Sequence, residues 1–179
     1  MEPDPYAGEV DVYDVTSAAV SEHDVPFYRA LAADAGGPLL ELGCGTGRVL
    51  VPCAEVAGRA VGVDASAAML ERAADRVAAA GLAGRVELRR ADMRSVRLGG
   101  AFPLVTVPFR SLFHLPTDDD WLAALATVRA HLAAGGRFAA DVFVPDPAPA
   151  SERRQLGDPG TGHRVVLEER VVYDTAGQR

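Results

Sequence analysis

The sequence of 179 residues contains no lysine, no asparagine and no isoleucine, and all 18 of its basic residues are arginine. Without lysine the chain cannot carry the G-x-x-x-x-G-K-[ST] loop that binds nucleotide phosphates. We interpret the bias toward arginine and alanine as the codon usage of a GC-rich bacterial genome rather than as a sign of function.

Long apolar runs and cysteines are also scarce. No charge-free hydrophobic stretch reaches the ~18 residues of a membrane span, so no membrane partner is expected. The two cysteines, Cys44 and Cys53, form no metal-binding or redox motif, and no metal is expected. Residues 1–5 are acidic and lack the basic-then-apolar order of a signal peptide, which favours a cytoplasmic protein.

The sequence also lacks clusters of positive charge. The net charge is −7, and the longest runs of consecutive basic residues are the arginine pairs at 89–90 and 153–154. A protein that follows a phosphate backbone needs clustered basic residues. The sequence therefore predicts a small-molecule partner and argues against nucleic acid.

Three alternating glycines are the most informative feature that is present. The run 39–48 reads as an apolar strand with Glu41 near its end, a turn through Gly43, Gly45 and Gly47, and the start of a helix. Glycine has no Cβ and tolerates positive φ, so a ligand can approach the backbone of such a turn closely. The spacing is not the G-x-G-x-x-G of dinucleotide-binding loops. The carboxylate of Glu41 would also repel a pyrophosphate and attract a ligand that carries positive charge.

A second acidic residue follows the next expected strand. Residues 60–63 are mainly apolar and Asp64 comes directly after them. An acid at the tip of the second strand of a βαβ unit commonly binds ribose hydroxyls. Together with the glycine turn, Asp64 predicts a nucleoside ligand.

The segment Glu41–Gly47 resembles the first motif, E/D-x-G-x-G-x-G, of the class I S-adenosylmethionine-dependent methyltransferases and matches every fixed position. Residues 62–66, 91–93 and 132–138 resemble three further motifs of that family, in the family's order. The resemblance extends over about residues 13–144. It implies that the ligand is S-adenosylmethionine, which carries an ammonium, a sulfonium and a carboxylate but no phosphate.

The same resemblance implies roles for individual residues. Asp64 would hold the ribose hydroxyls, Asp92 would meet the adenine amino group, and Met93 would pack on the adenine ring. For Asp64 and Asp92 the alternative is a helix or turn cap, and for Met69 it is core packing. Tyr13 resembles the aromatic residue that small-molecule methyltransferases place over the methionine end, with an ordinary lid as the alternative. The expected cofactor contacts are Tyr13, Glu41, Gly43, Gly45, Gly47, Asp64, Ala65, Met69, Asp92, Met93 and Pro108.

Alternating apolar strands and helices predict a single α/β domain with a doubly wound, mostly parallel, Rossmann-like sheet. Residues 1–37 would form an arm and a helix, residues 38–144 the cofactor-binding core, and residues 145–179 a loop and a β segment. Strands are expected at 38–42, 60–64, 86–90, 102–107 and 137–144. Helices are expected at 24–35, 48–57, 66–80 and from 117 to the glycines at 135–136.

Both ends of the chain carry separate expectations. Residues 1–16 should be irregular, and Asp24 should cap the first helix. Residues 145–162 should form a loop, followed by a strand at 165–173 and a hairpin turn at 174–178. Since no returning strand follows that turn, the sequence predicts an incomplete antiparallel strand pair.

Methyl transfer from a sulfonium needs mainly a well-placed nucleophile, and a general base only if the acceptor must lose a proton. The segment 108–115 follows the fourth strand and should face the acceptor. His114 is the candidate base, with a packed histidine as the alternative, whereas His131 should be exposed on an outer helix. Phe109, Arg110 and His114 are the expected substrate contacts. Arg110 would bind an acidic acceptor group or the cofactor carboxylate, with a salt bridge in the loop as the alternative.

The expected function is therefore methyl transfer to a nitrogen or oxygen of a small molecule. Residues 108–110 lack the N/D-P-P-Y/F motif of nucleic-acid amino methylases, which agrees with the charge argument. The chain departs from the family at Phe102, which is followed by proline where an acid is common. Two alternatives stay open: a non-catalytic cofactor-binding domain of the same fold, and a nicotinamide-dependent oxidoreductase, which the glycine spacing disfavours.

Overall fold

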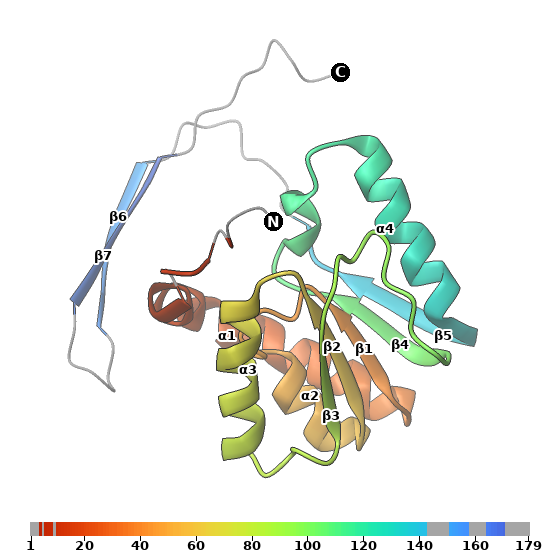
Figure 1. Cartoon of the computed structure of the whole chain (residues 1–179). Coiled ribbons are helices and arrows are strands. Elements are labelled where there is room, and N and C mark those ends of the chain that lie inside the picture. Colours follow the sequence, from red (N-terminus) through yellow and green to blue (C-terminus); the bar gives the residue numbers. More distant parts are fainter. Residues whose placement is uncertain (1–3, 5, 9, 143–150, 158–163, 171–179) are drawn as a thin grey trace.

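The computed structural model describes residues 4, 6–8, 10–142, 151–157 and 164–170 (Figure 1). Its centre is a five-stranded parallel sheet in the order β3-β2-β1-β4-β5. The strands are β1 (Leu39–Leu42), β2 (Ala60–Asp64), β3 (Val86–Arg90), β4 (Phe102–Val107) and β5 (Leu132–Ala140). The predicted α/β class and parallel sheet are confirmed, and the first four strands agree with prediction to within one residue.

Helices cover both faces of this sheet. They are α1 (Val10–Ala35), α2 (Leu50–Ala57), α3 (Ala67–Ala79), the 3₁₀ helix η1 (Ser111–His114) and α4 (Asp118–His131). One apolar core joins the sheet to α1, α2 and α3, and a second joins its other face to α4. Adjacent residues of β1 divide between these cores, Leu39 in the first and Leu40 in the second. A parallel strand covered on both faces is apolar throughout, which explains why β1 could be read from the sequence.

The order of the strands determines where a ligand can bind. The chain moves outward from β1 through β2 to β3, then returns to β4 on the other side of β1. Loops that leave β1 and β4 therefore diverge at their carboxyl ends and open a crevice, the usual ligand site in such sheets.

The first helix is much longer than predicted. It begins at Val10, so the expectation of irregular structure up to residue 16 is wrong, as is the assignment of Asp24 as its N-cap. Pro26 lies inside the helix, where its missing N–H removes one backbone hydrogen bond. Burial of Tyr28 and Ala32 in the first core offsets this loss, and such tertiary contacts are not visible in local sequence.

The junction of α4 and β5 also differs from prediction. The helix ends at His131, and Leu132 already has extended backbone. The glycines at 135–136 lie within β5, near a shift in its register with β4, and do not terminate the helix. His131 is buried rather than exposed. Its Nε2 accepts a hydrogen bond from the backbone N–H of Leu98 at 2.9 Å, and Nδ1 lies 2.7 Å from the Thr127 carbonyl oxygen.

The C-terminal strands form a separate antiparallel sheet of β6 (Ser151–Gly157) and β7 (Arg164–Arg170), which lies beside α1 in Figure 1. Strand β6 falls in the segment expected to be a loop. Strand β7 therefore pairs with the strand that precedes it in the chain, so the prediction that the final strand has no partner is wrong. The predicted turn at 174–178 lies outside the described residues. Among the described helices, none combines the length and apolarity that a bilayer span requires.

Candidate active site

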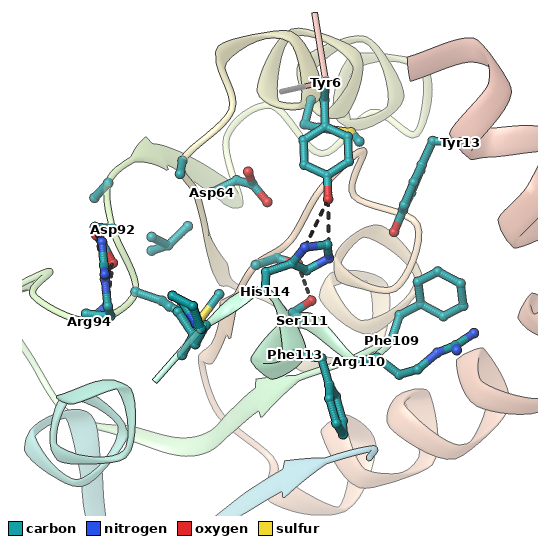
Figure 2. Close-up of a pocket in the computed structure, with 18 residues that line it drawn as sticks. Tyr6, Tyr13, Asp64, Asp92, Arg94, Phe109, Arg110, Ser111, Phe113 and His114 are labelled. Atoms are coloured by element: carbon teal, nitrogen blue, oxygen red, sulfur yellow. Dashed lines mark hydrogen bonds and ion pairs between the residues drawn. The ribbon is translucent and has the colours of Figure 1, made fainter. Parts of the chain in front are cut away.

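A pocket of about 850 Å³ lies at the carboxyl ends of β1, β2, β3 and β4 (Figure 2). Ten of the predicted site residues line it, and they come from α1, the glycine loop, α3 and the segments that follow β2, β3 and β4. They are Tyr13, Gly43, Asp64, Ala65, Met69, Asp92, Met93, Phe109, Arg110 and His114. Four other predicted site residues do not line it: Glu41, Gly45, Gly47 and Pro108.

The glycine loop passes close to its neighbours at the pocket floor. Gly43, Gly45 and Gly47 all have left-handed backbone, with φ of 72°, 52° and 76°. A Cβ on Gly43 would lie 2.8 Å from the Cβ of Ser111 and 3.1 Å from the Cε of Met93. Position 43 therefore requires glycine for two reasons, its left-handed backbone and the lack of space for a Cβ, as the sequence predicted for this turn.

Asp64 is fixed by the loop that it faces. Its Oδ2 accepts a hydrogen bond from the backbone N–H of Gly45 at 2.8 Å, and its Oδ1 accepts one from Ser66 at 2.9 Å. Burial raises the pKa of the Asp64 carboxyl, and these two hydrogen bonds oppose that rise. The carboxylate is thus held rigidly at the tip of β2 while it still lines the pocket.

Glu41 is not at the pocket rim, contrary to expectation. Its side chain is 1% exposed beneath the glycine loop, and its Oε2 has no hydrogen-bond partner. Burial raises the pKa of Glu41 well above the ordinary value, although the charge of Arg48 and the backbone N–H of Leu50 oppose the rise. Glu41 shares a face of β1 with Leu39, which packs in the first core, so its side chain is buried on that face and does not line the pocket.

Asp92 lines the pocket but is already paired. The guanidinium of Arg94 donates from Nε to both Asp92 oxygens and from Nη2 to Oδ2, and its Nη1 also donates to Asp120 at 2.5 Å. The hydrogen bonds from Arg94 lower the pKa of Asp92. Sequence reasoning missed Arg94, although its position two residues after the acid was an available signal.

The N-terminal arm supplies a wall of the pocket through contacts that the sequence did not predict. The hydroxyl of Tyr6 lies 3.2 Å from Nε2 and 3.4 Å from Nδ1 of His114 (Figure 2). The carboxylate of Asp4 accepts hydrogen bonds from the Ser66 hydroxyl at 2.9 Å and from the backbone N–H of Ala68 at 3.3 Å. The arm is therefore attached at the start of α3 and crosses to the loop after β4. No local pattern indicates a contact between residues 108 positions apart.

Tyr13 stands between the arm and the glycine loop. Its hydroxyl would lie 3.7 Å from a Cβ on Gly45, and its ring meets the rings of Tyr6 and Phe109 edge to face. Burial raises the pKa of Tyr13 to about 12, so the hydroxyl is neutral at physiological pH. The adjacent Asp14 accepts a hydrogen bond from the Thr46 hydroxyl at 2.7 Å, which fixes α1 to the glycine loop.

The arrangement suits a nucleoside that carries positive charge. Two acidic side chains, Asp64 and Asp92, stand at neighbouring strand ends, and aromatic rings crowd the side of the pocket nearest α1. Aromatic faces attract cations. Within the described part of the chain, no group of three histidine, cysteine, aspartate or glutamate side chains could hold a metal ion.

Comparison with known proteins agrees with this geometry. Residues 39–136 match a family model described as a methyltransferase domain. The chain is 29% identical over 180 residues to cypemycin N-terminal methyltransferase of a Streptomyces species, covering 95% of this chain and 69% of that protein. It is 36% identical over 98 residues to a dTDP-3-amino-3,4,6-trideoxy-α-D-glucopyranose N,N-dimethyltransferase of Streptomyces venezuelae, covering 55% of this chain and 39% of that enzyme.

Among solved structures, the glycopeptide N-methyltransferase MtfA complexed with S-adenosylmethionine superposes with a TM-score of 0.56 and 28% identity. The match covers 76% of this chain and 60% of MtfA, so the chain spans only part of that relative. The family match includes the glycine loop and both acidic strand ends, and it covers more than half of the sequence. The chain therefore belongs to the class I S-adenosylmethionine-dependent methyltransferases.

Proposed function

We propose that this domain binds S-adenosylmethionine in the pocket and transfers its methyl group to a nitrogen atom of a small-molecule acceptor. The observation that carries the proposal is the Asp64 carboxylate, fixed by the backbone N–H of Gly45 in a loop whose alternate residues are glycines with left-handed backbone. A carboxylate there accepts from ribose hydroxyls and disfavours a pyrophosphate. Nitrogen is favoured over oxygen because cypemycin N-terminal methyltransferase, the sugar N,N-dimethyltransferase and MtfA are named for N-methylation.

The nucleoside half of the cofactor would occupy the side of the pocket formed by β2 and the loop after β3. Asp64 would hold the ribose, and Met69 and Met93 would contact the base with their flexible side chains. Asp92 would accept a hydrogen bond from the adenine amino group beside its ion pair with Arg94. The pairing with Arg94 keeps Asp92 ionised, because it lowers the pKa of that carboxyl.

The acceptor would occupy the side formed by Tyr6, Tyr13, Phe109 and His114. When bound, the cofactor supplies an electrophilic methyl group on a sulfonium. An amine acceptor must reach it with a free lone pair, so a protonated amine first has to lose a proton. His114 is the base that we propose for this step, with the Tyr6 hydroxyl orienting its ring. Placement within the aromatic walls would provide most of the acceleration.

Titration calorimetry with S-adenosylhomocysteine and with NADH tests the cofactor. We expect the first to bind and the second not to bind. Asp64→Ala should weaken S-adenosylhomocysteine by ~1–3 kcal/mol, because charge-assisted hydrogen bonds are lost. If a folded Asp64→Ala variant binds S-adenosylhomocysteine as tightly as wild type, Asp64 does not bind the ribose. Binding of NADH would favour the oxidoreductase alternative.

Transfer itself is tested with S-adenosylmethionine labelled on its methyl group and a panel of amino sugars, peptides with free N-termini and phenols. Label in an amine supports the proposal, whereas label only in phenols would overturn the choice of nitrogen. Tight binding of S-adenosylhomocysteine without transfer to any member of the panel would favour the non-catalytic alternative.

A further inference from the structure

Two consecutive residues after β4 have backbone conformations that L-amino acids avoid. Phe109 has φ of 54° and Arg110 has φ of 61°, and among the described residues they are the non-glycine residues with positive φ. A side chain in this region crowds its own backbone. Such conformations persist where neighbouring groups hold them, and they occur often at functional sites.

A single carboxylate holds this pair. Asp141, directly after β5, accepts hydrogen bonds from the backbone N–H of Arg110 to Oδ1 at 2.7 Å and from that of Phe109 to Oδ2 at 2.8 Å. Its Oδ2 also accepts one from the Tyr28 hydroxyl of α1 at 2.9 Å. Hydrogen bonds to an ionised acceptor are shorter and stronger than neutral ones. Asp141 thus joins the turn to the end of β5 and to a buried residue of the first core.

The backbone conformation of residues 109–110 determines the position of one wall of the pocket. Phe109 and Arg110 line the pocket, as do Ser111, Phe113 and His114 of the 3₁₀ helix that follows. Ser111 packs against Gly43 so closely that a Cβ there would be 2.8 Å away. A change in the backbone at 109–110 would therefore move this wall against the glycine loop. Asp141 itself does not line the pocket.

We propose that Asp141 is a positioning residue of the methyl-transfer site, whose carboxylate fixes the left-handed Phe109–Arg110 turn and thereby places Ser111 and His114. The inference rests on the proposed function for its catalytic meaning, but the structural effect can be measured without cofactor or acceptor. The matched control is Tyr28→Phe, which removes one hydrogen bond to the same carboxylate and leaves both bonds to the turn.

Two readouts report on the turn directly. Trp121 is the sole tryptophan, its ring centroid lies 5.4 Å from that of Phe113, and its Nε1 donates to the Leu115 carbonyl oxygen at 3.2 Å. Its emission therefore reports the position of the segment after the turn. The chain has no lysine, so trypsin cleaves only after arginine, and mass spectrometry can follow cleavage after Arg110.

We expect Asp141→Ala to shift Trp121 emission and to accelerate cleavage after Arg110 at least tenfold, with far-ultraviolet circular dichroism unchanged. Tyr28→Phe should change that cleavage less than twofold. If Asp141→Ala fails to fold, Asp141→Asn keeps one acceptor oxygen and should show a smaller change in the same direction. A folded Asp141 variant with wild-type emission and cleavage would overturn the proposal.

Affinity for S-adenosylhomocysteine and its rescue separate positioning from general destabilisation. Asp141→Ala should weaken this ligand at least fivefold, because Ser111 lies on the glycine loop. Asp141→Ala should weaken binding less in an Arg110→Gly background than in the wild-type background, since glycine adopts φ near 61° without strain. Comparison with the Arg110→Gly single variant separates any direct contact of Arg110 with the ligand from this effect. An equal loss in both backgrounds would overturn the positioning role. A wild-type protein that does not bind S-adenosylhomocysteine would instead refute the proposed function, and the emission and cleavage readouts would still decide the role of Asp141.

Discussion

Glu41 shows how one buried charge can couple the glycine loop to pH. Its pKa is raised in the folded protein, mainly by burial, so the folded state binds a proton more tightly than the unfolded state does. The stability that this proton contributes is complete below the unfolded pKa, near the ordinary 4.5, and is lost as the pH rises through the folded pKa. Above that window the buried carboxylate opposes folding.

Glu41→Gln should remove this dependence, because the amide has nearly the same shape and no charge. We expect the melting temperature of the variant to rise relative to wild type as the pH is increased from about 4.5. Thermal unfolding at matched ionic strength over that range measures the difference. A gap between the two proteins that stays constant with pH would show that Glu41 is ionised equally in both states.

Substitution of Gly43 tests whether glycine is required there because Ser111 packs so closely or because the backbone is left-handed. Gly43→Ala adds both left-handed strain and a clash with Ser111. Gly81→Ala is the matched control, because φ is 68° there and nothing lies within 4 Å of the added Cβ. Both variants should lose ~1–2 kcal/mol of unfolding free energy from strain. Only Gly43→Ala should also weaken S-adenosylhomocysteine, by at least tenfold in calorimetry. Equal affinities would exclude the steric requirement.

At the residue scale, the sequence identified the side chains that stand at strand ends. Asp64 could be found because parallel strands end at a common edge, where an acid after an apolar run is conspicuous. Asp92 and Met93 follow a charged strand and were identified by their resemblance to a family motif. Tyr6 and Arg94 could not be found in this way. Tyr6 depends on where the arm lies, and Arg94 on how a side chain turns back to its neighbour. The prediction that the Glu41 side chain faces the ligand was also wrong. In an apolar strand that is covered on both faces, the sequence does not show which side chains point to which face.

Element boundaries were predictable where local chemistry sets them. The side chain of Ser66 accepts a hydrogen bond from the backbone N–H of Met69 and caps α3, at the start of the helix that the sequence predicted over residues 66–80. The start of α1 was not predictable, because its N-terminal half is held by contacts with other elements, such as the Thr46–Asp14 hydrogen bond. The end of α4 was missed because the glycines at 135–136 resemble a helix stop but lie in a strand.

A buried ion pair also joins α1 to the loop before α2. Arg48 donates two hydrogen bonds to Asp24, at 2.6 and 2.7 Å, and both side chains are mostly buried. Asp24→Ala should cost about 3 kcal/mol of unfolding free energy, because Arg48 loses its bidentate partner in a buried position. Glu55→Ala is the control, since it breaks the exposed Arg29–Glu55 pair at 3.9 Å and should cost less than about 1 kcal/mol.

Urea denaturation of both variants measures these values. If the cost of Asp24→Ala is as small as that of Glu55→Ala, the pair does not fasten α1. Loss of two-state unfolding only in Asp24→Ala would indicate that α1 detaches before the sheet unfolds.

At the scale of the whole molecule, the pocket is formed by segments that follow strands on both sides of β1 in the sheet and by residues near the N-terminus. The sheet provides the glycine loop and the acidic strand ends, whereas the N-terminal arm closes the side toward His114. A ligand in this pocket therefore lies between the arm and the sheet. We expect release of such a ligand to require movement of the arm, so that the attachment of the arm at α3 would affect the rate of dissociation.

We expect Asp4 to be the attachment that controls this motion. Its carboxylate accepts hydrogen bonds at the N-terminal end of α3, where the helix dipole also favours a negative charge. We expect Asp4→Ala to accelerate dissociation of S-adenosylhomocysteine at least threefold in stopped-flow experiments, with a smaller change in the association rate. Asp11→Ala is the control, because it removes an exposed ion pair with Arg72 and leaves the arm attached. Equal dissociation rates for the two variants would mean that the arm covers the pocket without retaining its ligand.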